Sequence, residues 1–274
     1  MNNCFFKNIG TFLIVYLIVF GIFSSLYYLF QKRDSYFERF KTLFKCDFVS
    51  PWTHENRGVC LMNSNKYDKA IKQFDKAIKL NPNDSFLYNT RGYCYLKLMQ
   101  HFEAIEDFNK AIELNPGDKF AYNNRAYSYT ELKQHDKAIE DFNKAVEFDS
   151  NNPLVYLNRG LSYGTLKQYD NAIDDFNKTI ELDPNNVHAH ENRGYSYSML
   201  KKYKKAIEDY NKAIELDPNN AYAHENRGFC YMNLNQYEKA IQDLNKALEL
   251  GSKNESWTRN NLKKAKELSS KQEK

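Results

Sequence analysis

The sequence predicts an all-α protein, a solenoid of repeated helical hairpins with one apolar segment before it. Three observations predict this class. A 34-residue pattern recurs six times without a gap, at 51–84, 85–118, 119–152, 153–186, 187–220 and 221–254. Small residues and large apolar ones return at the same places in every copy, and a long uncharged run lies near the amino terminus. We number the positions of each copy 1–34.

The chain starts with a short tail, residues 1–8, and an apolar run at 9–30. The 22 residues from Ile9 to Phe30 carry no charge, and a helix of that length spans about 33 Å, enough for a bilayer core. A cleaved signal peptide is the rival interpretation, but the run is long for one and no small-x-small site follows it. We therefore predict one uncleaved transmembrane helix.

Residues 31–50 form an aromatic and basic juxtamembrane segment. It can lie along the membrane interface, continue the preceding helix, or pack as a cap on the first repeat, and the sequence leaves these alternatives open. Five Lys or Arg residues lie in this segment, whereas only Lys7 precedes the apolar run. That bias predicts a single-pass membrane protein whose repeats face the cytosol.

Each repeat is predicted to hold helix A at about positions 2–14 and helix B at about positions 18–30. Small residues at positions 8 and 20 let the two helices approach closely, and large ones at position 24 fill the gap beside them. Position 8 is Gly58, Gly92, Ala126, Gly160, Gly194 and Gly228. Position 20 is Ala70, Ala104, Ala138, Ala172, Ala206 and Ala240. Position 24 is Phe74, Phe108, Phe142, Phe176, Tyr210 and Leu244.

Proline at position 32 (Pro82, Pro116, Pro184 and Pro218) ends helix B in four of the copies. This period and these letters resemble the tetratricopeptide repeat (TPR) family over residues 51–254. The resemblance implies a right-handed α-solenoid in which each hairpin buries its apolar stripe against its neighbours. Ala126 for Gly, Thr179 for Ala, and Ser150 and Ser252 for Pro are mild departures.

Residues 255–274 are predicted to form a capping helix with a basic tail. Leu262, Ala265 and Leu268 match positions 8, 11 and 14 of a further helix A, and the intervening lysines are left for solvent. Repeat arrays need such a polar end to stay soluble.

The charge and cysteine patterns exclude two classes of protein. The net charge of +4 comes from the flanks, so the repeats are near neutral and lack the basic face that nucleic-acid binding needs. Cys60, Cys94 and Cys230 share position 10, where the other copies have Ser, which indicates a small packing slot and no disulfide framework.

No catalytic constellation occurs in the sequence, and no residues remain to build a separate catalytic domain. The six histidines sit mainly at positions 4 and 17, where the other copies have Tyr, so they look like packing variants that lie one repeat apart. Metal ligands must converge on one point. We therefore expect a protein that is not an enzyme and has neither a metal nor a cofactor.

The resemblance implies a concave groove lined by positions 2, 5, 6, 9, 12 and 13 of helix A, and three of these columns are aromatic or amide. Position 2 is Trp52, Phe86, Phe120, Leu154, His188 and Tyr222. Position 9 is Val59, Tyr93, Tyr127, Leu161, Tyr195 and Phe229. Position 6 is Asn56, Thr90, Asn124, Asn158, Asn192 and Asn226. Helical spacing puts these columns on one face.

Amides offer a donor and an acceptor to a peptide backbone, and aromatic rings bury its side chains. The sequence thus favours an extended peptide held in the groove. The alternative is that the amides bond only to neighbouring helix ends and the rings pack between repeats. The chaperone dicarboxylate clamp is excluded, because no repeat has Lys at position 2 or 5 and none has Arg at position 6.

Position 7 is arginine in every copy: Arg57, Arg91, Arg125, Arg159, Arg193 and Arg227. Such a column could be a track for phosphates or acidic peptides. However, position 23 is aspartate in five copies, and position 7 adjoins the small residue that faces helix B. We therefore predict that these arginines pair with Asp107, Asp141, Asp175, Asp209 and Asp243, within a repeat or across to its neighbour.

The sequence as a whole predicts a membrane-anchored scaffold that binds a protein segment in its concave groove. The alternative is a structural or assembly component that binds through its convex or edge surfaces.

Overall fold

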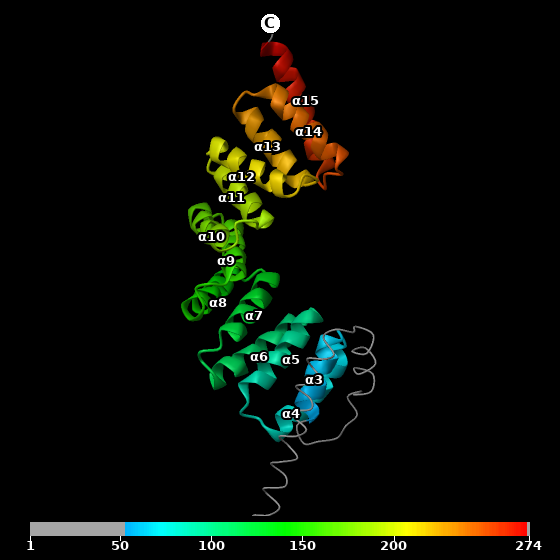
Figure 1. Cartoon of the computed structure of the whole chain (residues 1–274), viewed down its shortest axis with the longest axis vertical. Helices are drawn as coiled ribbons and strands as arrows, with labels where there is room; N and C mark the ends of the chain where they lie inside the picture. Colours follow the sequence, from blue (N-terminus) through cyan, green and yellow to red (C-terminus); the bar gives the residue numbers. More distant parts are fainter. Residues whose placement is uncertain (1–52, 273–274) are drawn as a thin grey trace, which may run out of the picture.

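Helices occupy most of the part of the chain that the computed structural model describes, residues 53–272, and no strand occurs there. They stack in sequence order along the long axis of the molecule (Figure 1). The bounds are α3 Thr53–Asn63, α4 Tyr67–Leu80, α5 Ser85–Lys97, α6 His101–Leu114, α7 Lys119–Glu131, α8 His135–Phe148, α9 Pro153–Thr165, α10 Tyr169–Leu182, α11 Val187–Met199, α12 Tyr203–Leu216, α13 Ala221–Asn233, α14 Tyr237–Glu249 and α15 Glu255–Gln272.

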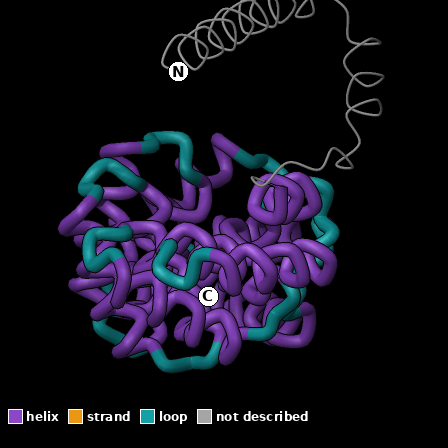
Figure 2. The backbone as a smooth tube through the Cα atoms, turned by 90° about the horizontal axis from the view of Figure 1, so that it is seen from below, coloured by secondary structure: helices purple, strands orange, loops and turns teal. Residues whose placement is uncertain are grey.

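Each helix contacts the next one along the chain, so six hairpins, α3–α4 to α13–α14, build the array within the described residues. The view along the long axis shows the helices joined by short loops (Figure 2). This confirms the predicted all-helical solenoid.

The helix ends differ slightly from the predicted ones. Helix A from α5 to α13 starts at position 1 because an Asp or Asn at position 34 caps it, as Asp118 does by accepting hydrogen bonds from the backbone N–H groups of Phe120 and Ala121. The other caps are Asp84, Asn152, Asn186 and Asn220. Between the helices of each repeat, position 15 is left-handed, with φ between 57° and 60°.

Small residues allow close packing inside each hairpin, as predicted. The position-20 alanines are completely buried, and the position-24 side chains are at most 1% exposed. A Cβ atom on Gly160 would lie 2.7 Å from Cε1 of Phe176, so the ring fills the space that glycine leaves. At position 10, Cys94 and Cys230 are buried, and burial raises the pKa of their thiols to about 12 and about 11, so both are protonated packing groups.

Helix α15 closes the carboxyl-terminal end. Its Ala265 and Leu262 pack with Ala240 and Leu244 of the last repeat. Thr258 donates a hydrogen bond to the buried carboxylate of Glu225 (2.7 Å), which also accepts one from Ser252 (3.1 Å).

No helix between residues 53 and 272 combines the length and the apolar character needed to cross a bilayer. The tail at 1–8, the expected span at 9–30 and the segment at 31–50 lie outside the described residues.

Candidate binding groove

The A helices form one continuous surface. Helix α3 contacts α5, α5 contacts α7, and this continues to α13 and α15, whereas no B helix in the described array contacts another B helix. The A helices are therefore closer together than the B helices, which makes the surface they line the concave one. We call this surface the groove.

The two predicted aromatic columns are exposed along the groove. Phe86, Phe120, Leu154 and Tyr222 at position 2, and Tyr127, Leu161 and Tyr195 at position 9, have between 37% and 62% of their surface exposed. Val59, Tyr93 and Phe229 are half-buried, and the ring of Phe229 lies 5.8 Å from that of Trp257 in α15. His188 is exposed. Trp52 lies outside the described residues.

The position-6 side chains are partly engaged within the protein. Asn192 and Asn226 donate from Nδ2 to the backbone carbonyls of His188 and Tyr222, one turn earlier in the same helix, at 2.7 and 2.8 Å. Asn124 donates to Oδ1 of Asn89 in the preceding repeat at 3.3 Å. Thr90 is buried and Asn158 is half-buried, whereas Asn56 is exposed and has contacts of its own. The carbonyl oxygens of Asn192 and Asn226 keep their capacity to accept a hydrogen bond.

Two clefts open between neighbouring A helices. One, of about 400 Å³, lies between α5 and α7, and its lining includes Tyr93, Tyr127 and the charged residues Lys97 and Glu131. Asn123 also lines it, and its buried Oδ1 has no hydrogen-bond partner in the described structure. Burial and the nearby Glu131 raise the pKa of Tyr127, so its hydroxyl stays protonated as a donor. The other cleft, of about 320 Å³, lies between α9 and α11 and reaches Tyr222.

The arginine column does not line the groove. Arg159 holds Asp175 of its own repeat with Nε at 2.8 Å and Nη2 at 2.6 Å, and both side chains are largely buried. The same bidentate pairing joins Arg91 to Asp107, Arg125 to Asp141, Arg193 to Asp209 and Arg227 to Asp243. The predicted pairing is therefore confirmed for these five repeats, and the arginines from Arg91 to Arg227 are structural.

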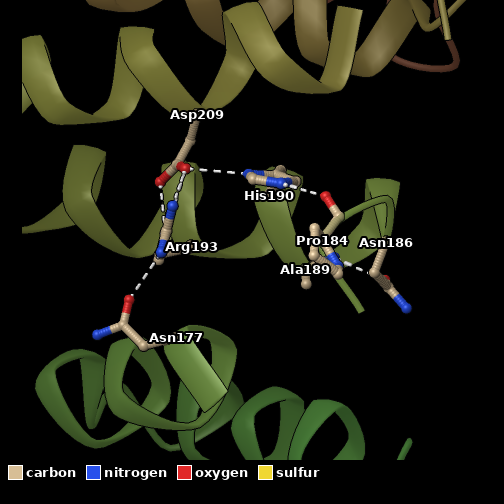
Figure 3. Close-up of polar contacts among 7 residues, drawn as sticks. All are labelled: Asn177, Pro184, Asn186, Ala189, His190, Arg193 and Asp209. Carbon is tan, nitrogen blue, oxygen red and sulfur yellow. Dashed lines mark hydrogen bonds and ion pairs between the residues drawn. The ribbon is translucent and has the colours of Figure 1, made fainter. Parts of the chain in front are cut away.

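Each of these arginines also reaches the preceding repeat. The Nη1 atom of Arg193 donates to Oδ1 of Asn177 at 2.8 Å (Figure 3). The equivalent position-25 partners are Asp75, Asn109, Asn143 and Asn211. One guanidinium thus binds helix A to its own helix B and to helix B of the neighbour.

Two histidines join this network in the last two repeats. Nδ1 of His190 lies 3.3 Å from Oδ1 of Asp209, and its Nε2 lies 3.2 Å from the carbonyl oxygen of Pro184 (Figure 3). His224 contacts Asp243 in the same way at 3.1 Å. The position-4 histidines of these repeats are therefore polar partners of a buried aspartate, more than packing variants of tyrosine.

His224 changes the electrostatics of Asp243. Burial raises the pKa of Asp107, Asp141 and Asp175, whose repeats have tyrosine at position 4. Burial acts in the same direction on Asp243, but hydrogen bonds from Arg227 and His224 outweigh it and hold the pKa of that carboxyl below its ordinary value.

The family is decided by matches that cover most of the array. A tetratricopeptide repeat family model matches residues 51–84, 85–118, 120–152, 153–186 and 188–220, and a second model of that repeat matches residues 209–242. The chain belongs to the tetratricopeptide repeat family. TPR arrays serve as protein–protein interaction scaffolds, and the TPR fold is typically not enzymatic.

Solved structures share the TPR fold at low sequence identity. YrrB, described as a TPR protein with an unusual peptide-binding site, is 24% identical with a TM-score of 0.61, covering 66% of this chain and 93% of YrrB. MamA from Desulfovibrio magneticus RS-1 is 21% identical with a TM-score of 0.59, covering 61% and 94%. A chain of the APC/C hetero-tetramer Cut9–Hcn1 is 22% identical with a TM-score of 0.59, covering 78% and 42%. No curated protein matches the sequence.

Sequence reasoning missed the position-25 and position-34 side chains of these TPR units. Both columns carried a signal, because position 25 is Asp or Asn in every repeat and position 34 is Asp or Asn in every repeat. A short polar side chain that recurs in every repeat indicates a fixed partner. Glu225, which holds α15, carried no such signal, because its column also contains Asn and Leu.

Proposed function

We propose that the groove binds an extended segment of a partner protein. The observation that carries this proposal is the stripe of exposed rings at positions 2 and 9 beside the position-6 amides, all on the concave surface. Rings of this kind bury apolar side chains of a peptide, while amide oxygens accept hydrogen bonds from its backbone N–H groups.

The engagement of Asn192 and Asn226 within their own helices supports this interpretation. Because Nδ2 is anchored to a carbonyl one turn earlier, the side chain is fixed and its Oδ1 is presented in a defined direction. A fixed acceptor loses less conformational entropy when it binds than a mobile one does.

The test replaces Asn124, Asn158, Asn192 and Asn226 together with alanine. Each net hydrogen bond contributes roughly 0.5–1.5 kcal/mol, so we expect partner affinity to fall by one or more orders of magnitude with helical content unchanged. The partner is first identified by photo-cross-linking from a benzoylphenylalanine placed at Phe120, with Glu140 on the exposed side of α8 as the matched control position. Unchanged affinity in a fully helical variant would contradict binding through the position-6 amides and would favour binding through the convex or edge surfaces.

We further propose that residues 9–30 anchor the array in a membrane, with the repeats in the cytosol. The uncharged length of this segment and the excess of Lys and Arg after it support this arrangement. Protease added outside sealed vesicles should digest the repeats when the cytosolic face of the membrane is outermost, and it should leave them intact when that face is inside. Digestion only from the opposite side would show that the repeats lie outside the cytosol. Release of the chain from the membrane by alkaline carbonate would contradict a transmembrane anchor.

A further inference from the structure

One glycine in the groove has no packing reason to be a glycine. Gly164 is at position 12 of helix α9, where the other repeats have Met62, Leu96, Thr130, Ser198 and Met232. A Cβ atom built on Gly164 would meet no heavy atom within 4 Å. Glycine inside a helix costs roughly 0.5–1 kcal/mol relative to alanine. Gly164 therefore makes helix α9 less stable than alanine would, and it leaves open space beside the helix.

That space belongs to the cleft between α9 and α11, which we call the Gly164 cleft. Leu161, Tyr169, Tyr195 and Tyr222 line it, and Lys167 is its one charged lining residue. Its volume of about 320 Å³ lies at the lower limit of small-molecule pockets, about 300–1,000 Å³, and suits a single large side chain. In the α5–α7 cleft, by contrast, Leu96 occupies position 12 and Lys97 and Glu131 line the opening.

The lining sets the chemistry of the occupant. Three tyrosine rings and a leucine offer apolar surface, so a buried charge other than one paired with Lys167 would lose its hydration without compensation. Partial burial and the neighbouring Tyr195 raise the pKa of Tyr222, which keeps its hydroxyl protonated. Asn192 also lines this cleft, and because its Nδ2 is held by the carbonyl oxygen of His188, its Oδ1 can accept a hydrogen bond from the backbone of a bound peptide.

We propose that the Gly164 cleft is the specificity pocket of the groove and receives one large uncharged side chain, aliphatic or aromatic, from the bound segment. The proposal rests on the peptide-binding function proposed above and adds which repeat selects the peptide and for what chemistry. Leu161 and the tyrosines would enclose the side chain, and Asn192 would bind the adjacent backbone.

The test uses the full chain and a phage-displayed library of random twelve-residue peptides. Enriched peptides are synthesised, and their Kd values are measured by fluorescence polarisation against the wild type and Gly164→Leu, which fills the cleft. Asn171→Leu is the matched control, because it places the same leucine on the exposed side of α10 in the same repeat, outside the cleft. A Cβ atom at position 164 meets no heavy atom within 4 Å, and the cleft of about 320 Å³ beside it leaves room for the rest of the leucine. We therefore expect the melting temperature of Gly164→Leu to equal or exceed that of the wild type.

We expect the enriched peptides to share one large apolar residue. Gly164→Leu should raise their Kd by about tenfold or more, equivalent to roughly 1.4 kcal/mol, while Asn171→Leu leaves it within about threefold. Equal affinity for Gly164→Leu and wild type overturns the pocket, as does a shared acidic residue, which would indicate pairing with Lys167. If affinity falls in Asn192→Ala but not in Gly164→Leu, the pocket fails and the groove function stands. If the affinity falls in neither variant, or if no peptide is enriched, both the pocket and the proposed groove function are contradicted.

Discussion

Every position-7 arginine from Arg91 to Arg227 neutralises a buried aspartate and crosses to the preceding repeat with its remaining nitrogen. A leucine at this position would pack the same interface without charge. The arginine instead makes three directed hydrogen bonds at fixed angles, as Arg159 does with Asp175 and Asn143. The geometry of the joint between repeats is therefore set by hydrogen bonds as well as by shape.

Arg159→Leu should destabilise the protein more than Arg159→Leu combined with Asp175→Leu. The single change leaves the nearly buried carboxylate of Asp175 without its cation, a loss of about 3–5 kcal/mol for buried pairs. The double change replaces the pair with apolar groups and should recover most of that loss. Urea unfolding followed by circular dichroism measures both, and a double variant less stable than the single one would contradict the account.

His224→Tyr should raise the pKa of Asp243, because it removes one of the two groups that hold this pKa below its ordinary value. A carboxyl whose pKa is lowered by folding stabilises the folded state at every pH above its pKa in the unfolded chain, roughly 3.9. That contribution is lost as the pH falls through the folded pKa. The variant should therefore lose less stability between neutral and acid pH than the wild type. Carboxyl-carbon NMR titration reports the pKa directly, and Tyr88→His is the converse control, which should lower the pKa of Asp107.

The arginine–aspartate pairing could be predicted because residues of opposite charge recur at positions 7 and 23, which indicates that the two positions are in contact. The histidine contacts could not. Substitution of Tyr by His at position 4 shows that the site tolerates both residues, but not that the ring nitrogen faces Asp209 or Asp243. The exposed rings of the groove were predicted as columns, whereas the Gly164 cleft depends on the space between two helices, which periodicity does not describe.

At the scale of single elements, the helices follow from local chemistry, although helix A from α5 to α13 and every helix B start one residue earlier than predicted. Proline at position 32 marked the end of helix B, but the start of helix A was placed one residue late because the Asx cap at position 34 was overlooked. The cap fixes the first turn by accepting backbone N–H groups, so a side chain outside the helix decides where the helix begins.

Helix α15 depends on a buried polar contact, which Thr258→Val should break. Valine keeps the shape of threonine but removes one of the two hydroxyl donors to the buried carboxylate of Glu225, at a cost of about 1–3 kcal/mol. Hydrogen exchange should then accelerate in α13, α14 and α15 while α5–α8 stay protected. Thr165→Val, which changes an exposed threonine in α9, is the control, and equal acceleration in α5–α8 would contradict a local role for the cap.

Across the whole molecule, stability should depend on where along the array a defect lies. Phe142 and Leu244 are both completely buried, in the third and the last repeat, and their replacement by alanine costs about 3–5 and 2–5 kcal/mol, respectively. Because each repeat contacts only its neighbours, Phe142→Ala should let the array open in the middle and separate into two blocks. Leu244→Ala should fray only α13–α15. Residue-resolved hydrogen exchange distinguishes these outcomes from a uniform loss of protection in both variants, which would mean that the array unfolds as one unit.

The link from Arg159 to Asn143 and Asp175 has a consequence for inheritance. Position 25 is Asn or Asp in every repeat, so whichever repeat precedes another supplies an acceptor of the same kind at the same place. If residues 119–152 were lost by unequal crossing-over, Asn109 would stand where Asn143 stands now, and Arg159 would find an equivalent oxygen. The gene can therefore gain or lose whole repeats with the joint between them intact, and the groove can change its length in steps of one repeat.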